Sequence, residues 1–185
     1  MTALRLTVIF SILFLPTIGF AATANLRPNG DDTILWGASP SWSVIDDAVT
    51  QPTAGSGDLI TADKFDDLEE NIWNMTTQAG VGTATQVVLW INSKLITSSV
   101  NIILTCRLNL GGWTSTQNIT INSETAGWYS LTFTGTWTSG NVDGMQVGIK
   151  TPTISAAEDG IDMDVMYTEI TYTAGTSSDD AFLIF

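Results

Sequence analysis

Apolar and polar residues alternate most regularly between residues 100 and 110. The apolar positions of this segment are Val100, Ile102, Leu104, Cys106, Leu108 and Leu110. The positions between them are mostly polar, as at Thr105, Arg107 and Asn109. Because successive side chains of a strand point to opposite faces, this pattern predicts a half-buried β-strand with Cys106 on its apolar face.

The same period of two recurs around Leu89, Leu131 and Val147. Strands are expected at residues 33–36, 42–46, 58–61, 85–92, 100–110, 117–122, 128–134, 144–150 and 161–173. Turns rich in glycine separate several of these segments, and strands do not alternate with helices along the chain. The sequence therefore predicts an all-β protein with an antiparallel β-sandwich.

The last expected strand, at residues 161–173, carries apolar residues on both of its faces. This is typical of a central strand, or of a strand with a β-bulge that shifts its phase, here near Met166.

Residues 63–75 follow a different period. Phe65, Leu68, Ile72 and Met75 recur at steps of three and four residues, which suits an amphipathic helix. Thr61 or Asp63 would cap its N-terminus. We expect a short helix here, with an irregular connection as the alternative, because a strand reading of the same residues alternates poorly.

Two parts of the chain resemble a known group of domains. The segment Gly144–Lys150 and the strand Val165–Tyr172 resemble the end of short jelly-roll domains of bacterial, archaeal and phage surface or fibre proteins. Residues 26–30 and Trp42–Asp47 resemble the beginning of those domains. The resemblance implies a jelly-roll fold with an adhesive, fibrous or virion-associated role, and it supplies no active-site residues. The acidic segment 63–70 departs from it.

The N-terminus has the order of a secretory signal. Arg5 precedes an apolar run at residues 6–15, and small residues follow between Gly19 and Ala24. The apolar run is shorter than the ~20 residues of a membrane-spanning helix, which is the alternative. We expect a signal peptide at residues 1–21, and cleavage as late as residue 24 is the alternative end of that peptide. A secreted or surface-bound sandwich would occupy residues 22–173, with no transmembrane segment in the mature chain.

Composition narrows the range of functions. Without Arg5 the mature chain has five cations against nineteen acidic residues, which disfavours nucleic acid as a partner. Histidine is absent from the sequence, so the commonest general base and zinc ligand are missing. The single cysteine, Cys106, can form no internal disulfide, and we expect an inert buried thiol. No cofactor is expected apart from a possible calcium ion.

Acidic residues form the candidate metal sites. One group contains Asp63, Asp66 and Asp67, and a second contains Asp162 and Asp164 on one expected strand. Carboxylate oxygens are the ligands that calcium prefers, although neither spacing is that of an EF-hand. The alternative is a solvated acidic face. The segment Gly160–Val165 also resembles a glycosidase strand, but Gly160 and Val165 stand where the two catalytic carboxylates are required. We therefore expect no enzyme.

Three of the seven tryptophans are candidates for carbohydrate binding. Trp90 and Trp128 fall in the register opposite to the apolar one, and Trp113 follows two glycines in a turn. The alternative is that these rings are buried in the sandwich or in a subunit contact.

The chain ends in a polar, acidic tether followed by an apolar segment, which together cover residues 174–185. The apolar segment contains Phe182, Leu183, Ile184 and Phe185, too few residues to cross a membrane. We expect it to dock on its own sandwich or on another subunit. The main hypothesis is therefore a secreted, non-catalytic subunit of an extracellular fibre, surface layer or virion-like assembly, whose partners are copies of itself or another surface protein. A carbohydrate-binding module or adhesin is the alternative, and a glycoside hydrolase is the third possibility.

Overall fold

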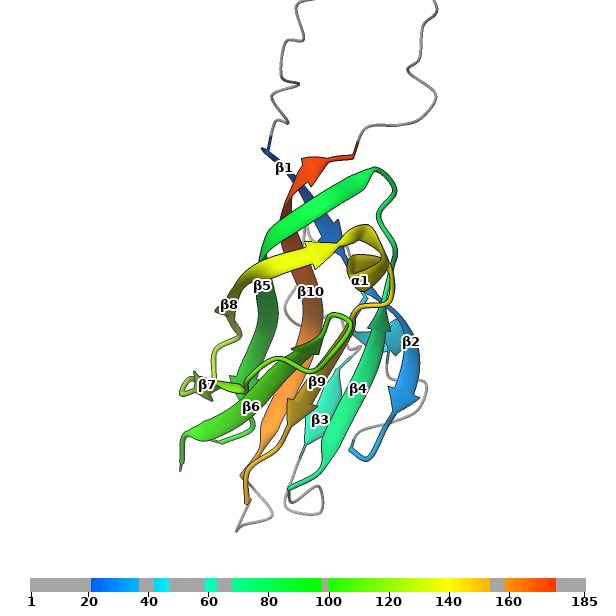
Figure 1. Ribbon diagram of the computed structural model, residues 1–185. Helices are drawn as coiled ribbons and strands as arrows, with labels where there is room; N and C mark the ends of the chain where they lie inside the picture. Colours follow the sequence, from blue (N-terminus) through cyan, green and yellow to red (C-terminus); the bar gives the residue numbers. More distant parts are fainter. Residues whose placement is uncertain are drawn as a thin grey trace, which may run out of the picture.

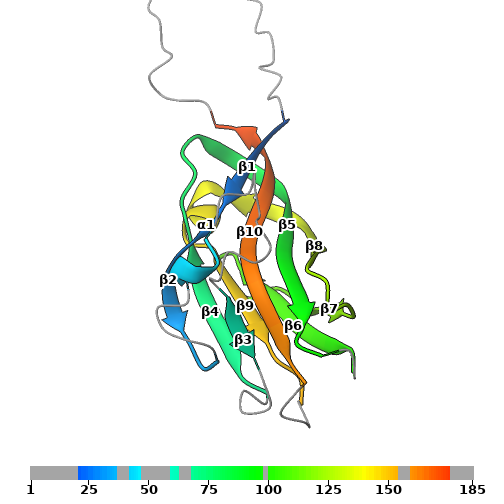
Figure 2. The same ribbon diagram turned by 180° about the vertical axis from the view of Figure 1, so that it is seen from behind.

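The computed structural model describes residues 21–36, 42–46, 59–62, 68–97, 100–153 and 159–175. Over these residues the chain forms two antiparallel sheets packed face to face (Figures 1 and 2). The predicted all-β, jelly-roll-like sandwich is confirmed. No helix among the described residues is long and apolar enough to span a membrane.

The first sheet is built around the last strand of the chain. Its strands, in spatial order, are β1 (Ala21–Leu26), β10 (Ile161–Ala174), β5 (Val81–Leu95) and β8 (Gly127–Thr138). The short strand β3 (Ile60–Ala62) pairs with the beginning of β10, on the edge that β1 occupies further along. β10 is therefore a central strand, as its two apolar faces predict.

The second sheet contains the strand that the ladder at residues 100–110 predicts. Its strands, in spatial order, are β2 (Pro28–Thr33), β4 (Glu70–Met75), β9 (Gln146–Lys150), β6 (Ile102–Asn109) and β7 (Gln117–Ile121). The short helix α1 (Ser139–Asp143) joins β8 to β9, and a 3-10 turn, η1, covers Trp42–Val44.

The core lies between the two sheets. From the ladder, Leu104, Cys106 and Leu108 are fully buried against the inner residues of the facing sheet. Trp36 and Trp73 are the largest buried side chains, and their rings meet edge to face with centroids 5.8 Å apart. The inward register of the ladder is thus confirmed from Ile102 to Leu110, including the buried thiol, whereas Val100 is 43% exposed and precedes the strand.

The helix expected at 63–75 is wrong over the described residues, because Glu70–Met75 is strand β4. Asn71, Trp73 and Met75 are its buried positions. The polar Asn71 occupies an inward position because its Oδ1 accepts hydrogen bonds from the backbone N–H groups of Leu35 and Trp36, at 2.7 and 3.0 Å. Its Nδ2 donates to the Trp36 carbonyl at 2.7 Å. This inward asparagine hides the period of two.

Two expected strands near the N-terminus are also wrong. The strand lies earlier than residues 33–36, at Pro28–Thr33, and residues 42–44 form the 3-10 turn instead of a strand. The residue after this turn still contacts the first sheet, because the Ile45 carbonyl accepts a hydrogen bond from Met166 N–H at 3.0 Å. Met166 lies in the part of β10 between the residues that pair with β3 and those that pair with β1. The other expected strands are present with shifted ends.

A β-bulge breaks the register of β10. Met163 pairs with Ser93 and Val165 pairs with Asn92, so Asp164 is the extra residue. A bulge shifts the alternation by one, which is why Met163 and Met166 are both in the core. The predicted phase shift is confirmed, two residues before the expected place. The signal peptide expected at residues 1–21, except for Ala21, and the apolar C-terminal segment lie outside the described residues.

Candidate functional site

Two of the three tryptophans proposed for carbohydrate binding meet on the outer face of the first sheet. Trp90 of β5 stacks on Tyr167 of β10, with ring centroids 6.2 Å apart and an interplanar angle of 15°. Trp128 of β8 packs edge-on against both rings, at 6.5 Å from Trp90 and 5.7 Å from Tyr167. Trp128 remains 38% exposed. The contacts hold this indole in a fixed orientation while part of its surface faces solvent.

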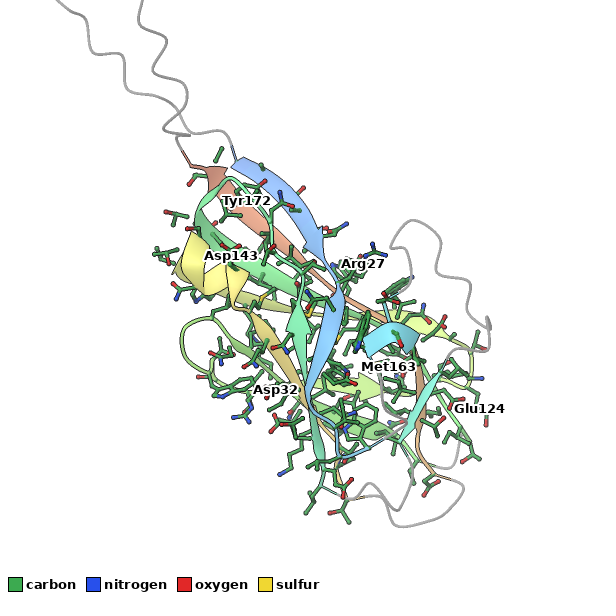
Figure 3. All side chains as sticks on the ribbon, turned by 90° about the vertical axis from the view of Figure 1, so that its right-hand side faces the viewer. Arg27, Asp32, Glu124, Asp143, Met163 and Tyr172 are labelled. Atoms are coloured by element: carbon green, nitrogen blue, oxygen red, sulfur yellow. The ribbon has the colours of Figure 1, made fainter. Side chains whose placement is uncertain are left out.

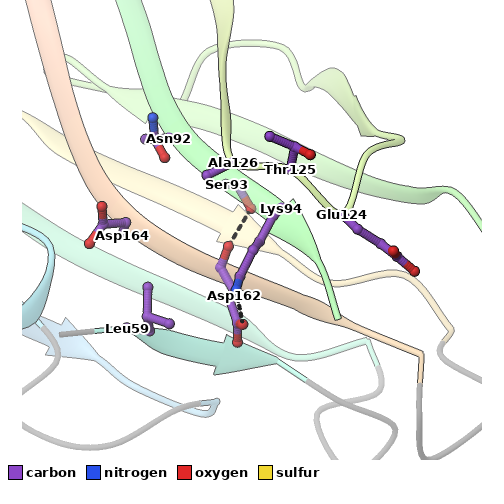
Figure 4. A pocket seen from close by; sticks show the side chains of 9 residues that line it. All are labelled: Leu59, Asn92, Ser93, Lys94, Glu124, Thr125, Ala126, Asp162 and Asp164. Carbon is purple, nitrogen blue, oxygen red and sulfur yellow. Dashed lines mark hydrogen bonds and ion pairs between the residues drawn. The ribbon is translucent and has the colours of Figure 1, made fainter. Parts of the chain in front are cut away.

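A pocket of about 400 Å³ lies beside this aromatic cluster, where β5 and β10 run together with the loop that precedes β8 (Figure 4). The residues that line it are Leu59, Asn92, Ser93, Lys94, Glu124, Thr125, Ala126, Asp162 and Asp164. Asn92 pairs in register with Trp128, so the pocket and the exposed indole are neighbours on one surface. Figure 3 places Glu124 at one end of the molecule and Tyr172 at the other, toward the ends of β1 and β10.

Asn92 lines the pocket with a side-chain oxygen whose hydrogen-bonding requirement is unmet. It is 4% exposed, and its Oδ1 is buried without a hydrogen-bond partner among the described residues. Figure 4 shows this oxygen on the side of Asn92 that faces Asp162. A buried carbonyl oxygen without a donor costs about 1–3 kcal/mol, so a ligand hydroxyl or cation that reaches it would be bound favourably.

Two of the three carboxylates that line the pocket, those of Asp162 and Asp164, differ in their surroundings. Asp162 forms an ion pair with Lys94 at 3.5 Å, and its Oδ1 accepts a hydrogen bond from the Thr61 hydroxyl at 2.8 Å. The backbone carbonyl of Asp162 accepts a second one from the Ser93 hydroxyl, also at 2.8 Å. Asp164, which the bulge turns toward the pocket, is 2% exposed. The fold therefore fixes both the carboxylate and the backbone carbonyl of Asp162.

The structure brings Asp162 and Asp164 to one pocket, as the calcium hypothesis requires. The described residues contain no group of three or more acidic, histidine or cysteine side chains that could hold a metal ion. Asp63, Asp66 and Asp67 lie outside the described residues. Calcium stays a prediction for Asp162 and Asp164, whose carboxylate oxygens would be its ligands.

Trp113, the third proposed tryptophan, is on the other sheet. Its side chain is 39% exposed, and the Arg107 guanidinium lies over its ring at 4.0 Å from the centroid. Trp113 thus belongs to a separate surface from Trp90 and Trp128. The apolar positions proposed for assembly, Phe182, Leu183, Ile184 and Phe185, lie outside the described residues.

Burial raises the pKa of two side chains, Tyr167 in the first sheet and Cys106 in the second. Desolvation, followed by the charge of Glu169, raises the pKa of Tyr167, which keeps its phenol protonated beside the indoles. Desolvation also raises the pKa of the Cys106 thiol to about 12. The buried thiol that the ladder predicts is confirmed, and its inertness stays a prediction.

Asn92, Lys94 and Tyr167 are the site residues that the sequence did not reveal. Trp90, Asn92 and Lys94 share one face by simple alternation, so the outward register of β5 held part of the signal. Their neighbours on β10 could not be assigned, because the bulge at Asp164 changes which residues of β10 face outward.

Comparisons with known proteins give likenesses of fold. No family model matches the sequence, and no curated protein matches it. Among solved structures, a CBM35 domain from Cellvibrio japonicus is 13% identical with a TM-score of 0.49, and the match covers 84% of this chain and 100% of that domain. A family 35 carbohydrate binding module from an environmental isolate is 13% identical, with 81% and 98% coverage and a TM-score of 0.43. A cleaved adhesin domain of Lys-gingipain from Porphyromonas gingivalis is 7% identical, with 60% and 73% coverage and a TM-score of 0.37.

Proposed function

We propose that this protein is a non-catalytic carbohydrate-binding domain, and that its ligand occupies the pocket beside Trp128. The observation that carries the proposal is the buried Oδ1 of Asn92, which lacks a donor among the described residues and faces a pocket next to a fixed, half-exposed indole. The proposal therefore favours the alternative over the fibre subunit as the primary role.

The chemistry of the pocket suits a sugar. A pyranose ring has an apolar face that packs on an indole and a rim of hydroxyl groups that donate and accept hydrogen bonds. Here Trp128 would supply the stacking surface, Asn92 and Asp164 would accept from hydroxyls, and Lys94 would donate. A pocket with an aromatic wall and a few converging polar groups is the usual form of a small-molecule site.

The same groups do not form a hydrolase centre. A retaining glycosidase needs one carboxylate as nucleophile and a second as general acid, about 5 Å apart on either side of the scissile bond. Asp162 is already held by Lys94 and Thr61, which makes its carboxylate a fixed acceptor. Gly160 and Val165 stand where that strand would carry the two catalytic residues. Binding without turnover is the activity proposed.

The test begins with a glycan array probed with residues 22–185, with calcium present and after chelation, and continues with calorimetry on the best ligand. Trp128→Ala should weaken binding at least tenfold, about 1.4 kcal/mol. Trp128→Phe should retain part of the affinity. Ile103→Ala, an exposed apolar truncation on the other sheet, is the control and should bind like the wild type.

Asn92→Leu separates a ligand-binding role from a structural one. Replacing an unpartnered buried amide by an apolar side chain of similar size should leave the free energy of unfolding unchanged or raise it. The same change should weaken glycan binding at least tenfold. Absence of any glycan ligand at millimolar concentration, or unchanged binding in both Trp128→Ala and Asn92→Leu, would contradict the proposal.

A further inference from the structure

The outer face of the second sheet carries Trp113 on a rigid turn. Gly111 adopts a φ of 79°, and the chain then returns along β6, where Trp113 bridges to Asn109. Thr114 N–H donates to the Leu108 carbonyl at 2.8 Å, and Leu108 N–H donates to the Thr114 hydroxyl at 3.0 Å. Because Trp113 pairs with Asn109, its ring lies on the outer face of the sheet, together with Arg107.

The Arg107 guanidinium lies over that ring and forms an ion pair with Glu70 across strand β9. Arg107 Nε and Nη2 each donate to one oxygen of the Glu70 carboxylate at 2.7 Å, a bidentate geometry. Gly148 lies between them, and a Cβ at that position would meet Glu70 Oε1 at 2.7 Å and Trp113 at 3.3 Å. The missing side chain of Gly148 therefore leaves room for the ion pair and the indole to stack, and these three side chains, Glu70, Arg107 and Trp113, form a platform.

Lys150 supplies an uncommitted positive charge next to this platform. It pairs in register with Glu70 on one side and Thr105 on the other, and lines a hollow of about 230 Å³ with Glu70, Thr105, Arg107 and Thr116. Glu70 is already bound to Arg107, and among the described residues no carboxylate forms an ion pair with Lys150. Of the four cations among the described residues, Lys150 is one of the two that form no ion pair.

A row of amides borders the other side of the platform. Asn109 Nδ2 donates to Gln146 Oε1 at 2.9 Å, and Gln146 Nε2 donates to Asn74 Oδ1 at 3.0 Å. Gln146, Gly148 and Lys150 are alternate residues of β9, so amides, platform and cation follow one another over about 13 Å along the strand. Three amide side chains therefore form this border.

We propose that this face is a second glycan-binding surface, and that it takes an anionic saccharide, carboxylated or sulfated. One ring of the ligand would stack on Trp113, its hydroxyls would meet the amides, and its negative group would pair with Lys150. Local charge favours this ligand, because no described carboxylate forms an ion pair with Lys150, whereas the Arg107 charge is balanced by Glu70. A protein partner would be expected to bury more aliphatic surface than these amides and hydroxyls offer.

The surface is independent of the pocket, so the two proposals can fail separately. Two sites on opposite sheets would let one domain engage two glycan chains, which raises avidity on a polymer without any new contact.

The test uses three hexasaccharides of matched length: a galacturonic acid hexamer, a sulfated galactose hexamer and the neutral galactose hexamer. We expect an acidic hexamer to bind more tightly than the neutral one, with an affinity that falls as salt rises. Trp113→Ala should weaken that binding at least tenfold, and Trp113→Phe should restore part of it. Lys150→Gln should remove the preference for the acidic hexamer and its salt dependence.

The control is Val100→Ala, which truncates an exposed apolar side chain that lines neither proposed site and should bind the acidic hexamer like the wild type. Trp128→Ala distinguishes the two proposals, because Trp128 belongs to the pocket on the opposite sheet. The proposal would be overturned if neither acidic hexamer bound more tightly than the neutral one, or if Trp113→Ala and Lys150→Gln bound like the wild type. It would also be overturned if Trp128→Ala weakened the same ligand as much as Trp113→Ala, because a single site would then explain both. A thermal melt of each variant identifies loss of folding.

Discussion

At the scale of single residues, the buried thiol of Cys106 links the core to the pH dependence of stability. Burial raises its pKa from 9.0 to about 12. Between these values the unfolded chain loses the thiol proton while the folded chain keeps it, so the folded state loses stability as the pH rises. The contribution is complete below pH 9 and falls by about 1.4 kcal/mol for each pH unit above it.

Urea unfolding at pH 8 and pH 10 measures this effect. Tyrosines and lysines titrate in the same range, so the control is Cys106→Val, which fills the same site without an ionisable group. We expect the wild type to lose about 1 kcal/mol more than the variant between the two pH values. Equal losses in the two proteins would show that the thiol ionises without unfolding.

Asn71 is the residue that most misled the sequence analysis, and it should matter most to the second sheet. Asn71→Leu would leave the N–H groups of Leu35 and Trp36 without their acceptor, and each buried group costs about 1–3 kcal/mol. We expect the free energy of unfolding to fall by at least about 2 kcal/mol. Asn118→Leu, an exposed asparagine of β7 that accepts one hydrogen bond from Thr105, should cost less than about 0.5 kcal/mol. Similar losses in the two variants would argue against the structural role of Asn71.

At the scale of elements, prediction succeeded where alternation alone decides the face. In β5, β6 and β8 the apolar register alternates without interruption over residues 87–91, 102–108 and 129–133, and the inward residues there are the ones expected. The prediction failed at β4, where the polar Asn71 faces inward because the backbone N–H groups of Leu35 and Trp36 need an acceptor. This need arises from contacts between distant parts of the chain, so the local pattern does not show it. The prediction failed in the same way at the pocket, because the pairing of β10 with β5 depends on the bulge at Asp164. The candidate tryptophans were thus predictable one by one, but their grouping was not.

The beginning of β4 offers a test of backbone conformation. Leu68 has a φ of 57°, in the left-handed region, and its side chain is 54% exposed. A non-glycine residue loses roughly 1–2 kcal/mol there, whereas glycine adopts the conformation freely. We expect Leu68→Gly to leave the free energy of unfolding unchanged or to raise it by up to about 1 kcal/mol.

Ile103→Gly is the matched control for that prediction. Ile103 is 46% exposed within strand β6, where glycine adds only flexibility to the unfolded chain. This variant should lose about 1 kcal/mol in urea unfolding. If Leu68→Gly lost as much as Ile103→Gly, the left-handed conformation at Leu68 would not be a source of strain.

At the scale of the whole molecule, the described ends of the chain and the pocket lie at opposite ends of the sandwich. Ala21 pairs with Thr173, and Gly175 N–H donates to the Gly80 carbonyl. Glu124, which lines the pocket, lies at the other end of the molecule (Figure 3). A domain attached through the end that holds residues 21 and 175 would therefore present the pocket away from its attachment.

This arrangement allows glycan binding and assembly to be tested separately by truncation after Gly175. β10 ends at Ala174, so residues 22–175 keep every described strand except the first residue of β1. We expect this fragment to have the unfolding free energy of residues 22–185 to within about 0.5 kcal/mol, and the same glycan affinity.

If the apolar segment with Phe182, Leu183, Ile184 and Phe185 joins neighbouring subunits, electron microscopy should show filaments of the longer chain and none of the fragment. A loss of more than about 2 kcal/mol in the fragment would instead mean that the segment docks on its own sandwich, because removing buried apolar side chains costs that much. Filaments formed by both chains would show that assembly does not depend on the segment.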